Sequence, residues 1–307
     1  MNSNTPIVDL GAFYGNHLFV KREDLIPFSF GGNKARKAEL FFKEIDQGGF
    51  GSVVTYGTGS SNHCRVVANL CCGRDLPCYV ISPLEVSDPT FNSHMIEMFG
   101  AEVISVPVAE VHETIETKLE ELRRKGSRPY FIEGGGHGNT GTEAYVRCYE
   151  EIRSQEQEMS LRFSHIFFAS GTGTTQAGLV CGKLLHDDDR HIIGISIARK
   201  NPRGRNVVLD SIRSYLGGRV SEEQIQSATE FVDDFTDGYG RDDPRVIETI
   251  QRALMQYGMP LDFTYTGKAF MGMTEYIKKK KIREENILFI HTGGTPLFFD
   301  TLRRTEL

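Results

Sequence analysis

The chain has 307 residues, of which 39% are hydrophobic and 25% charged, so it is long and apolar enough to fold into one large or two medium domains and is not a disordered protein. Its net charge of −6, with one short basic run at Lys278–Lys281, excludes a primary role on nucleic acid. No stretch is apolar enough to span a membrane and no export signal begins the chain, which predicts a cytoplasmic protein that contacts no membrane.

The first element expected is a helix that begins near Ala35, directly after Gly31, Gly32 and Asn33. Lys34 stands at the N-terminus of this helix, where the positive end of the helix dipole favours a neutral amine. A neutral lysine amine can act as a nucleophile or form a Schiff base. This position alone is weak evidence, because most lysines lie outside active sites.

From about Gly51 the chain alternates β-branched runs with amphipathic stretches, a pattern typical of parallel strands joined by crossover helices. Strands are expected at 52–57, 77–83, 102–107, 130–135, 165–170, 191–198 and 286–294. Helices are expected at 60–72, 91–100, 111–126, 143–157, 174–185 and 245–258, and a further helix is expected to end in the basic run at 278–281. The fold class is therefore α/β, with two open, mainly parallel twisted sheets covered by helices.

A polar stretch at Arg153–Leu161 separates the first four of these strands from the rest. We expect a smaller domain of residues 47–155 and a larger domain of residues 1–46 plus 156–307. Among the six cysteines, Cys64, Cys71, Cys72 and Cys78 are close in sequence but show no CxxC spacing. Reduced thiols are therefore expected, and no metal site.

Open α/β sheets bind ligands beyond the carboxyl ends of their strands, and five turns at such positions are rich in Gly, Ser, Thr and Asn. These turns are YGTGSSNH, EGGGHGNTG, ASGTGTTQAG, TYTGKAF and HTGGTP. In the third turn a strand ends at Ser170 and a helix begins near Thr174, so free backbone N–H groups meet the helix dipole. That arrangement suits a phosphate, although an ordinary tight turn is the alternative.

The spacing of the third turn limits which phosphate compound it can bind. The glycines at 171, 173 and 178 depart from the dinucleotide fingerprint, and the strand at 191–198 has no acidic residue for a ribose. Leu179 stands where a Walker A loop needs lysine. A monophosphate site remains. Together with Lys34 and the hydroxyl-rich turns, it matches the requirements of pyridoxal 5′-phosphate.

Several strings in the chain resemble the fold type II (tryptophan-synthase-β-type) pyridoxal-phosphate enzymes, and most of all the D-cysteine desulfhydrase and 1-aminocyclopropane-1-carboxylate deaminase group. They are VKREDL, GGNKARKAELF, SSNHCRVVANL, ASGTGTTQAGL, DGYG, YTGKAFMGM and LFIHTGGTP, in the order that the group has them. The resemblance runs from about Val20 to Phe299. It implies a cofactor in the cleft between a larger and a smaller domain, and a homodimer.

The resemblance also assigns roles to residues. It implies that Lys34 is the Schiff-base lysine and the general base at Cα. Cofactor contacts are implied for Asn62 beside the phenolic oxygen, for Thr292 at the pyridine nitrogen, and for the phosphate-binding residues Gly171, Thr172, Gly173, Thr174 and Thr175. Substrate contacts are implied for Ser61, Asn62, His63, Tyr265 and Tyr239.

Structural roles remain open for several of these side chains. Ser61 and Asn62 make a good N-cap for the following helix, and Tyr265 could pack in the core. His63, His137 and His291 could be structural histidines.

Four positions depart from patterns of the group. Before Ser61 the group commonly has glutamine, whereas this chain has Ser60. Ring-opening deaminases carry glutamate where this chain has Thr266, whereas the desulfhydrases also have threonine there. Ring opening therefore ranks below β-elimination. His137 stands where a small hydroxyl residue is usual, and Glu143 where an apolar residue is usual. If either faces the pocket, it could recognise a polar or cationic group on a substrate other than cysteine.

The leading hypothesis is a pyridoxal-phosphate lyase that eliminates a β-substituent from a small α-amino acid such as D-cysteine, giving a 2-oxo acid and ammonia. Ser61 and Tyr265 are then candidates for moving protons at the leaving group. The alternatives are ring opening of an aminocyclopropane carboxylate, β-replacement in a specialised pathway, and a catalytically idle protein that only binds the cofactor or an amino acid.

Overall fold

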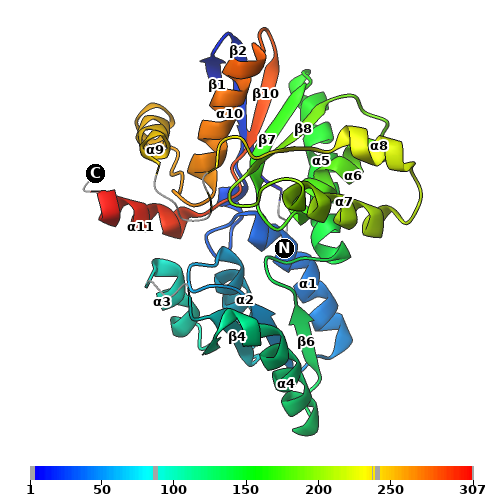
Figure 1. The fold of residues 1–307 in the computed structure, drawn as a ribbon, viewed down its shortest axis with the longest axis vertical. Helices are drawn as coiled ribbons and strands as arrows, with labels where there is room; N and C mark the ends of the chain where they lie inside the picture. Colours follow the sequence, from blue (N-terminus) through cyan, green and yellow to red (C-terminus); the bar gives the residue numbers. More distant parts are fainter. Residues whose placement is uncertain (1–3, 86–88, 237, 239–242, 306–307) are drawn as a thin grey trace.

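The computed structural model describes residues 4–85, 89–236, 238 and 243–305 (Figure 1). Its strands form a six-stranded sheet of order β1-β2-β10-β7-β8-β9 and a four-stranded sheet of order β5-β4-β3-β6. Only the pair β1–β2 is antiparallel among the described strand pairs. The predicted α/β class with two mainly parallel sheets is confirmed.

The six-stranded sheet joins the two ends of the chain. Its strands are β1 (Ile7–Phe13), β2 (Asn16–Lys21), β7 (His165–Ser170), β8 (His191–Ser196), β9 (Glu230–Val232) and β10 (Asn286–Ile290). Phe289 of β10 lies opposite Val20 of β2 on one side and Phe167 of β7 on the other. All three side chains are fully buried, because helices cover both faces of the sheet.

Two groups of helices cover this sheet. One core contains side chains of α5 (Asn139–Met159), α6 (Thr174–Leu185), α7 (Arg203–Leu216) and α8 (Glu222–Ala228). The other contains side chains of α9 (Pro244–Tyr257), α10 (Thr266–Lys280) and α11 (Thr295–Thr305). Helices α5 and α6 approach closely at Gly182, where an added Cβ would lie 2.5 Å from the ring of Tyr149. Glycine at this position lets α6 pack tightly against α5.

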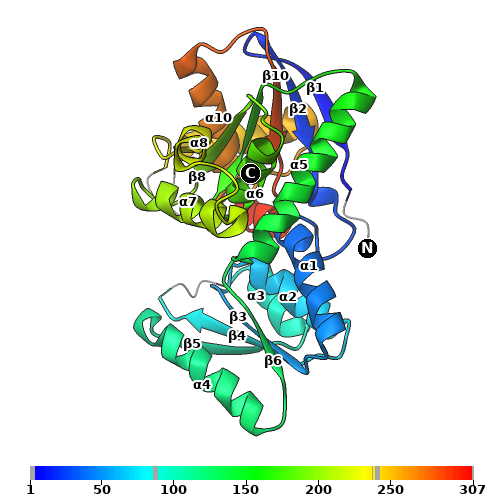
Figure 2. The same ribbon diagram turned by 90° about the vertical axis from the view of Figure 1, so that its right-hand side faces the viewer.

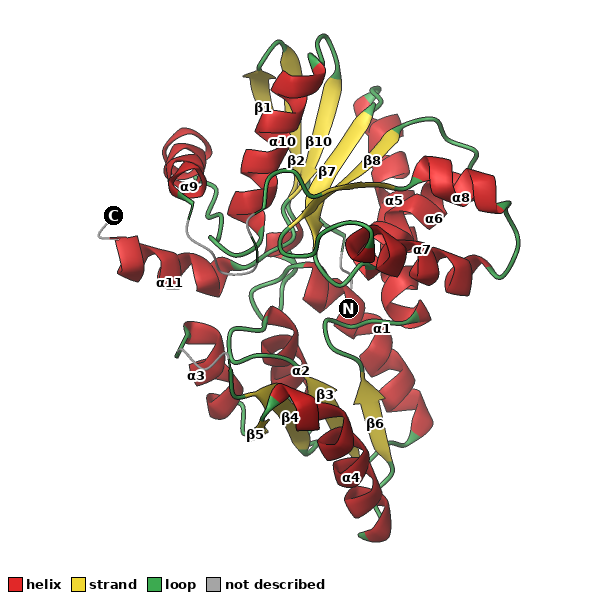
Figure 3. Ribbon diagram, viewed as in Figure 1, coloured by secondary structure: helices red, strands yellow, loops and turns green. Residues whose placement is uncertain are grey.

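The four-stranded sheet contains β3 (Ser52–Tyr56), β4 (Cys78–Pro83), β5 (Glu102–Val106) and β6 (Pro129–Ile132). Its cores contain α1 (Asn33–Gly48), α2 (Asn62–Cys72) and α3 (Phe91–Met98) in one cluster and α4 (Val111–Arg124) in another. Short 3₁₀ turns lie at Glu23–Leu25 and Val108–Glu110. The carboxyl ends of the parallel strands of both sheets face the middle of the molecule (Figure 3).

Helices α3 and α11 meet across the two sheets. The backbone N–H of Phe91, at the start of α3, donates to the Asp300 carboxylate of α11 at 3.1 and 3.2 Å. The rings of Phe91 and Phe299 pack edge to face with centroids 6.4 Å apart. Both helices lie on the same side of the molecule (Figure 1). This contact ties the smaller sheet to the C-terminal helix.

Each strand and helix predicted from the sequence has a counterpart in the structure. Helix α6 begins at the predicted Thr174, and α1 begins at Asn33, two residues before the expected Ala35. The sequence reading missed the β1–β2 hairpin, β9, α7, α8 and α11. The division into residues 47–155 and 1–46 plus 156–307 stays a prediction. The expected boundary at residue 155 falls within α5, which lies beside the six-stranded sheet (Figure 2) and buries Tyr145 in the core of that sheet.

No helix of the described residues is both long and apolar enough to cross a bilayer.

Candidate active site

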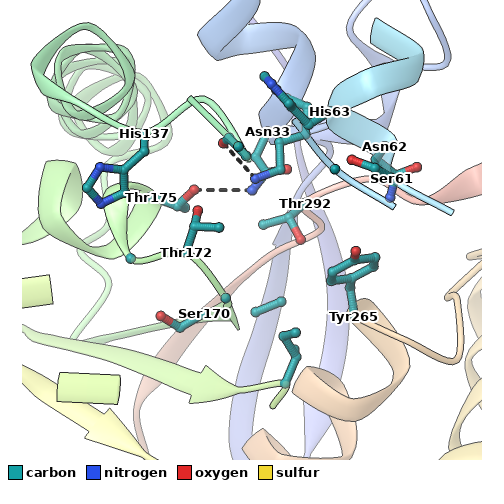
Figure 4. Close-up of a pocket in the computed structure, with 18 of the residues that line it drawn as sticks. Asn33, Ser61, Asn62, His63, His137, Ser170, Thr172, Thr175, Tyr265 and Thr292 are labelled. Carbon is teal, nitrogen blue, oxygen red and sulfur yellow. Dashed lines mark hydrogen bonds between the residues drawn. The ribbon is translucent and has the colours of Figure 1, made fainter. Parts of the chain in front are cut away.

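A cavity of about 680 Å³ lies where the carboxyl ends of the two sets of strands meet (Figure 4). Its walls come from the residues after β3, β6, β7, β8 and β10 and from the starts of α1, α2 and α10. This volume is in the range of small-molecule sites. The predicted site residues that line it are Lys34, Ser61, Asn62, His63, Gly171, Thr172, Gly173, Thr175, Tyr265 and Thr292.

Lys34 is the second residue of α1 and projects its amine into this cavity. Nζ donates a hydrogen bond to the Gly135 carbonyl at 2.9 Å. Burial lowers the pKa of Lys34 from 10.5 to about 8, because the charged ammonium loses its hydration. A large fraction of the amine is therefore neutral near pH 8, and the neutral amine is the form that attacks carbonyl groups.

Two glycines hold the loop before Lys34 directly against the loop after β10. A Cβ added at Gly293 would lie 2.5 Å from Gly32 Cα, and both glycines have positive φ angles, 95° and 92°. The Asn33 N–H donates to the Thr292 carbonyl at 3.0 Å. Only residues without a Cβ permit this contact. It places Thr292 and Lys34 on adjoining walls of the cavity.

The phosphate turn between β7 and α6 contributes Gly171, Thr172, Gly173 and Thr175 to the cavity. The side chain of Thr174 is directed elsewhere: it is fully buried and accepts a hydrogen bond from Lys37 Nζ at 2.6 Å. The hydroxyl of Thr174 is thus bonded inside the protein, and the predicted phosphate contact of Thr174 stays a prediction, through its backbone N–H. The turn still presents the start of a 12-residue helix to the cavity, which suits an anion.

Three residues around this turn were missed by the sequence reading. Lys37 is buried beside Thr174, and burial together with the charge of Lys34 lowers its pKa well below the ordinary value. Asn33 donates to Thr175 Oγ1 at 3.1 Å, and Arg199 donates to the Gly171 carbonyl at 2.7 Å. Lys34 and Lys37 are three residues apart and therefore lie on one face of the helix, a spacing that could have indicated Lys37 from the sequence.

Ser61, Asn62 and His63 form the start of α2 at another wall of the cavity. Ser61 is the N-cap, and its hydroxyl accepts from the Cys64 N–H at 3.2 Å. The capping role is thus present, and the same residue lines the cavity. The backbone N–H groups of this first turn form a second place where an anion can bind.

His63 is buried, and its pKa lies well below the ordinary value because of burial and the positive charges of Lys34 and Lys37. Its Nε2 lies 2.8 Å from Thr55 Oγ1. The Thr55 hydroxyl donates its only proton to the Ile132 carbonyl at 2.7 Å, so the Nε2 of His63 must be the donor. His63 is therefore neutral with its proton on Nε2.

Tyr265 precedes α10 and lines the cavity, with its backbone N–H bonded to Asp262 at 2.7 Å. The next residue, Thr266, is fully buried and donates to the same carboxylate at 2.7 Å. The position at which ring-opening deaminases carry glutamate is thus turned away from the cavity. Tyr239, the other predicted wall residue, lies outside the described residues.

The two unusual residues of the EGGGHGNTGTEAY segment separate in the structure. His137 lines the cavity on the side of the phosphate turn (Figure 4), and its Nε2 lies 3.3 Å from Ser211 Oγ. Glu143 lies on α5 and bonds Arg147 at 2.6 Å and the Tyr215 hydroxyl. Glu143 is not among the residues lining the cavity, which leaves it no direct part in recognising a ligand there.

The remaining candidates have structural surroundings. His291 is fully buried, and its Nε2 lies 3.1 Å from the Pro260 carbonyl, which fits the structural role considered for it. All six cysteines are free, and five of them are buried. Among the residues that the structure describes, no three histidine, cysteine or acidic side chains gather as metal ligands would.

Comparison with known proteins agrees with this geometry. The sequence model of a family described as pyridoxal-phosphate dependent enzyme matches residues 1–293. A D-cysteine desulfhydrase of Serratia proteamaculans is 29% identical over 310 residues, covering 97% of this chain and 94% of the relative. One of Yersinia enterocolitica is 30% identical over 301 residues, covering 94% and 90%. A crystal structure described as the ACC deaminase homologue superposes with a TM-score of 0.85 at 29% identity, covering 98% and 93% of the two chains.

Proposed function

Because the chain belongs to the family of pyridoxal-phosphate-dependent enzymes, we propose that it is a lyase that eliminates a β-substituent from a small α-amino acid, with D-cysteine as the leading candidate. The family resemblance and the cofactor predicted from the sequence are confirmed by the match over residues 1–293. The observation that carries the proposal is Lys34, a half-buried lysine whose amine has a lowered pKa, in one cavity with the phosphate turn.

The residues of the cavity fit the cofactor. We assign the amine of Lys34 to its aldehyde, the turn Gly171–Thr175 to its phosphate, the amide of Asn62 to its phenolic oxygen and the hydroxyl of Thr292 to its ring nitrogen. Lys37, behind the turn, donates a hydrogen bond to the Thr174 hydroxyl and so helps to hold the turn in place. When bound, pyridoxal 5′-phosphate supplies an aldehyde that combines with amines and a ring that withdraws electrons from Cα.

The protein's own side chains then have distinct tasks. Lys34 Nζ, neutral in part near pH 8, takes the proton from Cα of the substrate. The N–H groups at the start of α2 bind the substrate carboxylate, with Ser61 and Asn62 beside it. The hydroxyls of Ser61 and Tyr265 are the candidates for giving a proton to the departing β-group. His63, neutral and bonded to Thr55, keeps the first turn of α2 in place.

Elimination is favoured over ring opening by Thr266. Threonine has no carboxyl group to offer the cavity at this position, and its hydroxyl donates to Asp262 inside the protein. Ring opening stays the second candidate, because the ACC deaminase homologue resembles this chain closely in structure. The relatives named D-cysteine desulfhydrase support the first.

The deciding experiment is to incubate the purified protein with D-cysteine, L-cysteine, β-chloroalanine and 1-aminocyclopropane-1-carboxylate and to identify products by mass spectrometry. Pyruvate and ammonia from a β-substituted amino acid support elimination, and 2-oxobutanoate supports ring opening. A new substituted amino acid in the presence of an added thiol indicates β-replacement. A change in the cofactor spectrum without any product contradicts the proposal and indicates a binding protein.

We further propose that the protein acts in the cytoplasm as a homodimer, with small amino acids as its only partners. The six free cysteines support a reducing compartment. Light scattering after gel filtration measures the subunit number directly, and a single-chain mass at micromolar concentration contradicts the dimer.

A further inference from the structure

Arg65, in the first turns of α2, is a buried cation without an acidic partner. It is 0% exposed, and burial lowers the pKa of its guanidinium to about 10. Within the described part of the chain its hydrogen bonds go only to neutral oxygen atoms, and its Nε has no partner. Burying an arginine in this way is costly for folding unless a negative charge balances it. The cost calls for a compensating function.

The bonds of Arg65 fix the direction of the Asn62 side chain. The guanidinium NH1 donates to Asn62 Oδ1 at 2.5 Å, and Asn92 Nδ2 donates to the same atom at 2.9 Å. Arginine can only donate, so the bonded atom of Asn62 must be its oxygen. The amide nitrogen of Asn62 is then the atom left for the cavity that this residue lines. Asn62 thus offers the cavity a hydrogen-bond donor.

Arg65 also joins the segments that form this wall of the cavity. Its NH2 donates to the Ser29 carbonyl at 2.9 Å, five residues before Lys34. Its NH1 donates to Asn92 Oδ1 at 2.8 Å, and Asn92 in turn donates to the Ser60 carbonyl at 2.9 Å. The loop before α1, the loop before α2 and the start of α3 are therefore held by one positive side chain.

We propose that Arg65 is a positioning residue that makes the start of α2 selective for the carboxylate of the amino-acid substrate. It does so by turning the Asn62 amide nitrogen, whose two N–H donors can serve the phenolic oxygen and the carboxylate, toward the cavity, and by leaving an unbalanced positive charge behind the helix N-terminus. The bound carboxylate then supplies the negative charge that the buried guanidinium lacks. This inference rests on the proposed function only in taking an amino acid as the ligand.

The alternative is that Arg65 only ties the three segments together. The two roles differ in what they do to ligands with and without a carboxylate. A purely structural tie, when lost, weakens the binding of all amines to a similar extent. A charge that serves the carboxylate, when lost, weakens only the ligand that carries one.

The test uses the cofactor-loaded protein and measures the binding of two kinds of amine by the change in visible absorption. D- and L-alanine carry a carboxylate but no β-leaving group, and ethylamine lacks the carboxylate. The measurement therefore works whether or not the protein eliminates. The variants are Arg65→Gln, which removes the charge and keeps an amide donor, and Arg65→Lys, which keeps the charge. Arg74→Gln, which breaks the surface pair with Asp46 just beyond α2, is the control.

We expect the unmodified protein to prefer the better-bound enantiomer of alanine to ethylamine. Arg65→Gln should weaken alanine about 10- to 100-fold, as for a lost hydrogen bond to a charged group, and change ethylamine less than about threefold. Arg65→Lys should retain most of the preference, and Arg74→Gln all of it.

Equal weakening of both ligands, an unchanged alanine affinity in Arg65→Gln, or no preference in the unmodified protein would overturn the proposal. If Arg65→Gln does not load the cofactor, Arg65→Lys decides alone: a retained preference supports the role of the charge, and a lost one contradicts it.

Discussion

At the scale of single residues, the proposed chemistry of the site depends on the protonation of Lys34. Burial lowers the pKa of its amine to about 8. As the pH increases toward 8, the neutral fraction of the amine therefore rises about tenfold with each pH unit, and above 8 it levels off. We expect the apoprotein to bind pyridoxal 5′-phosphate at a rate that follows this curve. Stopped-flow absorbance between pH 6 and pH 10, with the cofactor's own titration measured separately, checks it.

Two variants on α1 control this prediction. Lys34→Ala should abolish the visible band of the bound cofactor, because Lys34 is the one lysine among the described residues that line the cavity. Lys43→Ala changes an exposed lysine of the same helix and should leave both band and pH curve unchanged. A band that persists in Lys34→Ala would remove this lysine from the site.

The residues of the site differ in how far the sequence could place them. Lys34, Ser61, Asn62 and Thr292 stand in glycine- or hydroxyl-rich turns after strands or at helix starts, and such turns face the ligand side of an α/β sheet. The directions of Thr174 and Thr266 depend on Lys37 and Asp262, whose positions only the folded chain determines. Local composition carries no information on these partners.

At the scale of elements, Asp262 holds the start of α10 and with it Tyr265. The carboxylate accepts from the backbone N–H groups of Tyr265 and Thr266 at 2.7 and 3.1 Å and from the Thr266 hydroxyl at 2.7 Å. It is fully buried, and burial raises the pKa of Asp262. Each of these donors therefore offsets part of the cost of a buried charge.

Thr266→Val removes one donor and should lower the free energy of unfolding by about 1–3 kcal/mol at neutral pH. The pKa of Asp262 rises further in the variant. A carboxyl group whose pKa is raised in the folded state makes the folded protein less stable as the pH increases. The difference from the unmodified protein should therefore shrink as the pH falls and the carboxyl becomes protonated. Urea unfolding at several pH values measures it, with Thr266→Ser as the control that keeps the hydroxyl. Equal losses in both variants would show that the hydroxyl is not responsible.

The elements themselves were predictable where their pattern is local. Strands such as β7 are continuous apolar runs bounded by turns, and helices such as α4 repeat apolar residues at helical spacing. The hairpin strand β1 was missed because it is half exposed and contains Gly11. Its neighbour β2 pairs with β10, more than 260 residues away, and no short window of sequence shows that pairing.

At the scale of the whole molecule, the contact between α3 and α11 links the two sheets beside the cavity. Asp300→Ala removes the acceptor for the Phe91 N–H and should destabilise the start of α3 by about 1 kcal/mol. Hydrogen exchange of the peptide spanning 91–98 should become roughly five- to tenfold faster, as measured by mass spectrometry. Asp243→Ala, which removes a similar cap from α9, should leave that peptide unchanged. Unchanged exchange in Asp300→Ala would show that the contact adds no stability to α3.

The pairing of β2 with β10 also has a consequence for biosynthesis. Residues 17–21 are synthesised long before their sheet partner at 286–290. The small sheet at 52–132 can assemble while translation continues, whereas the larger sheet must wait for the C-terminal segment. Lys34, already synthesised, thus acquires its complete surroundings only after Thr292 and Gly293 have been made. A truncated translation product would lack a working centre however well its first half had folded.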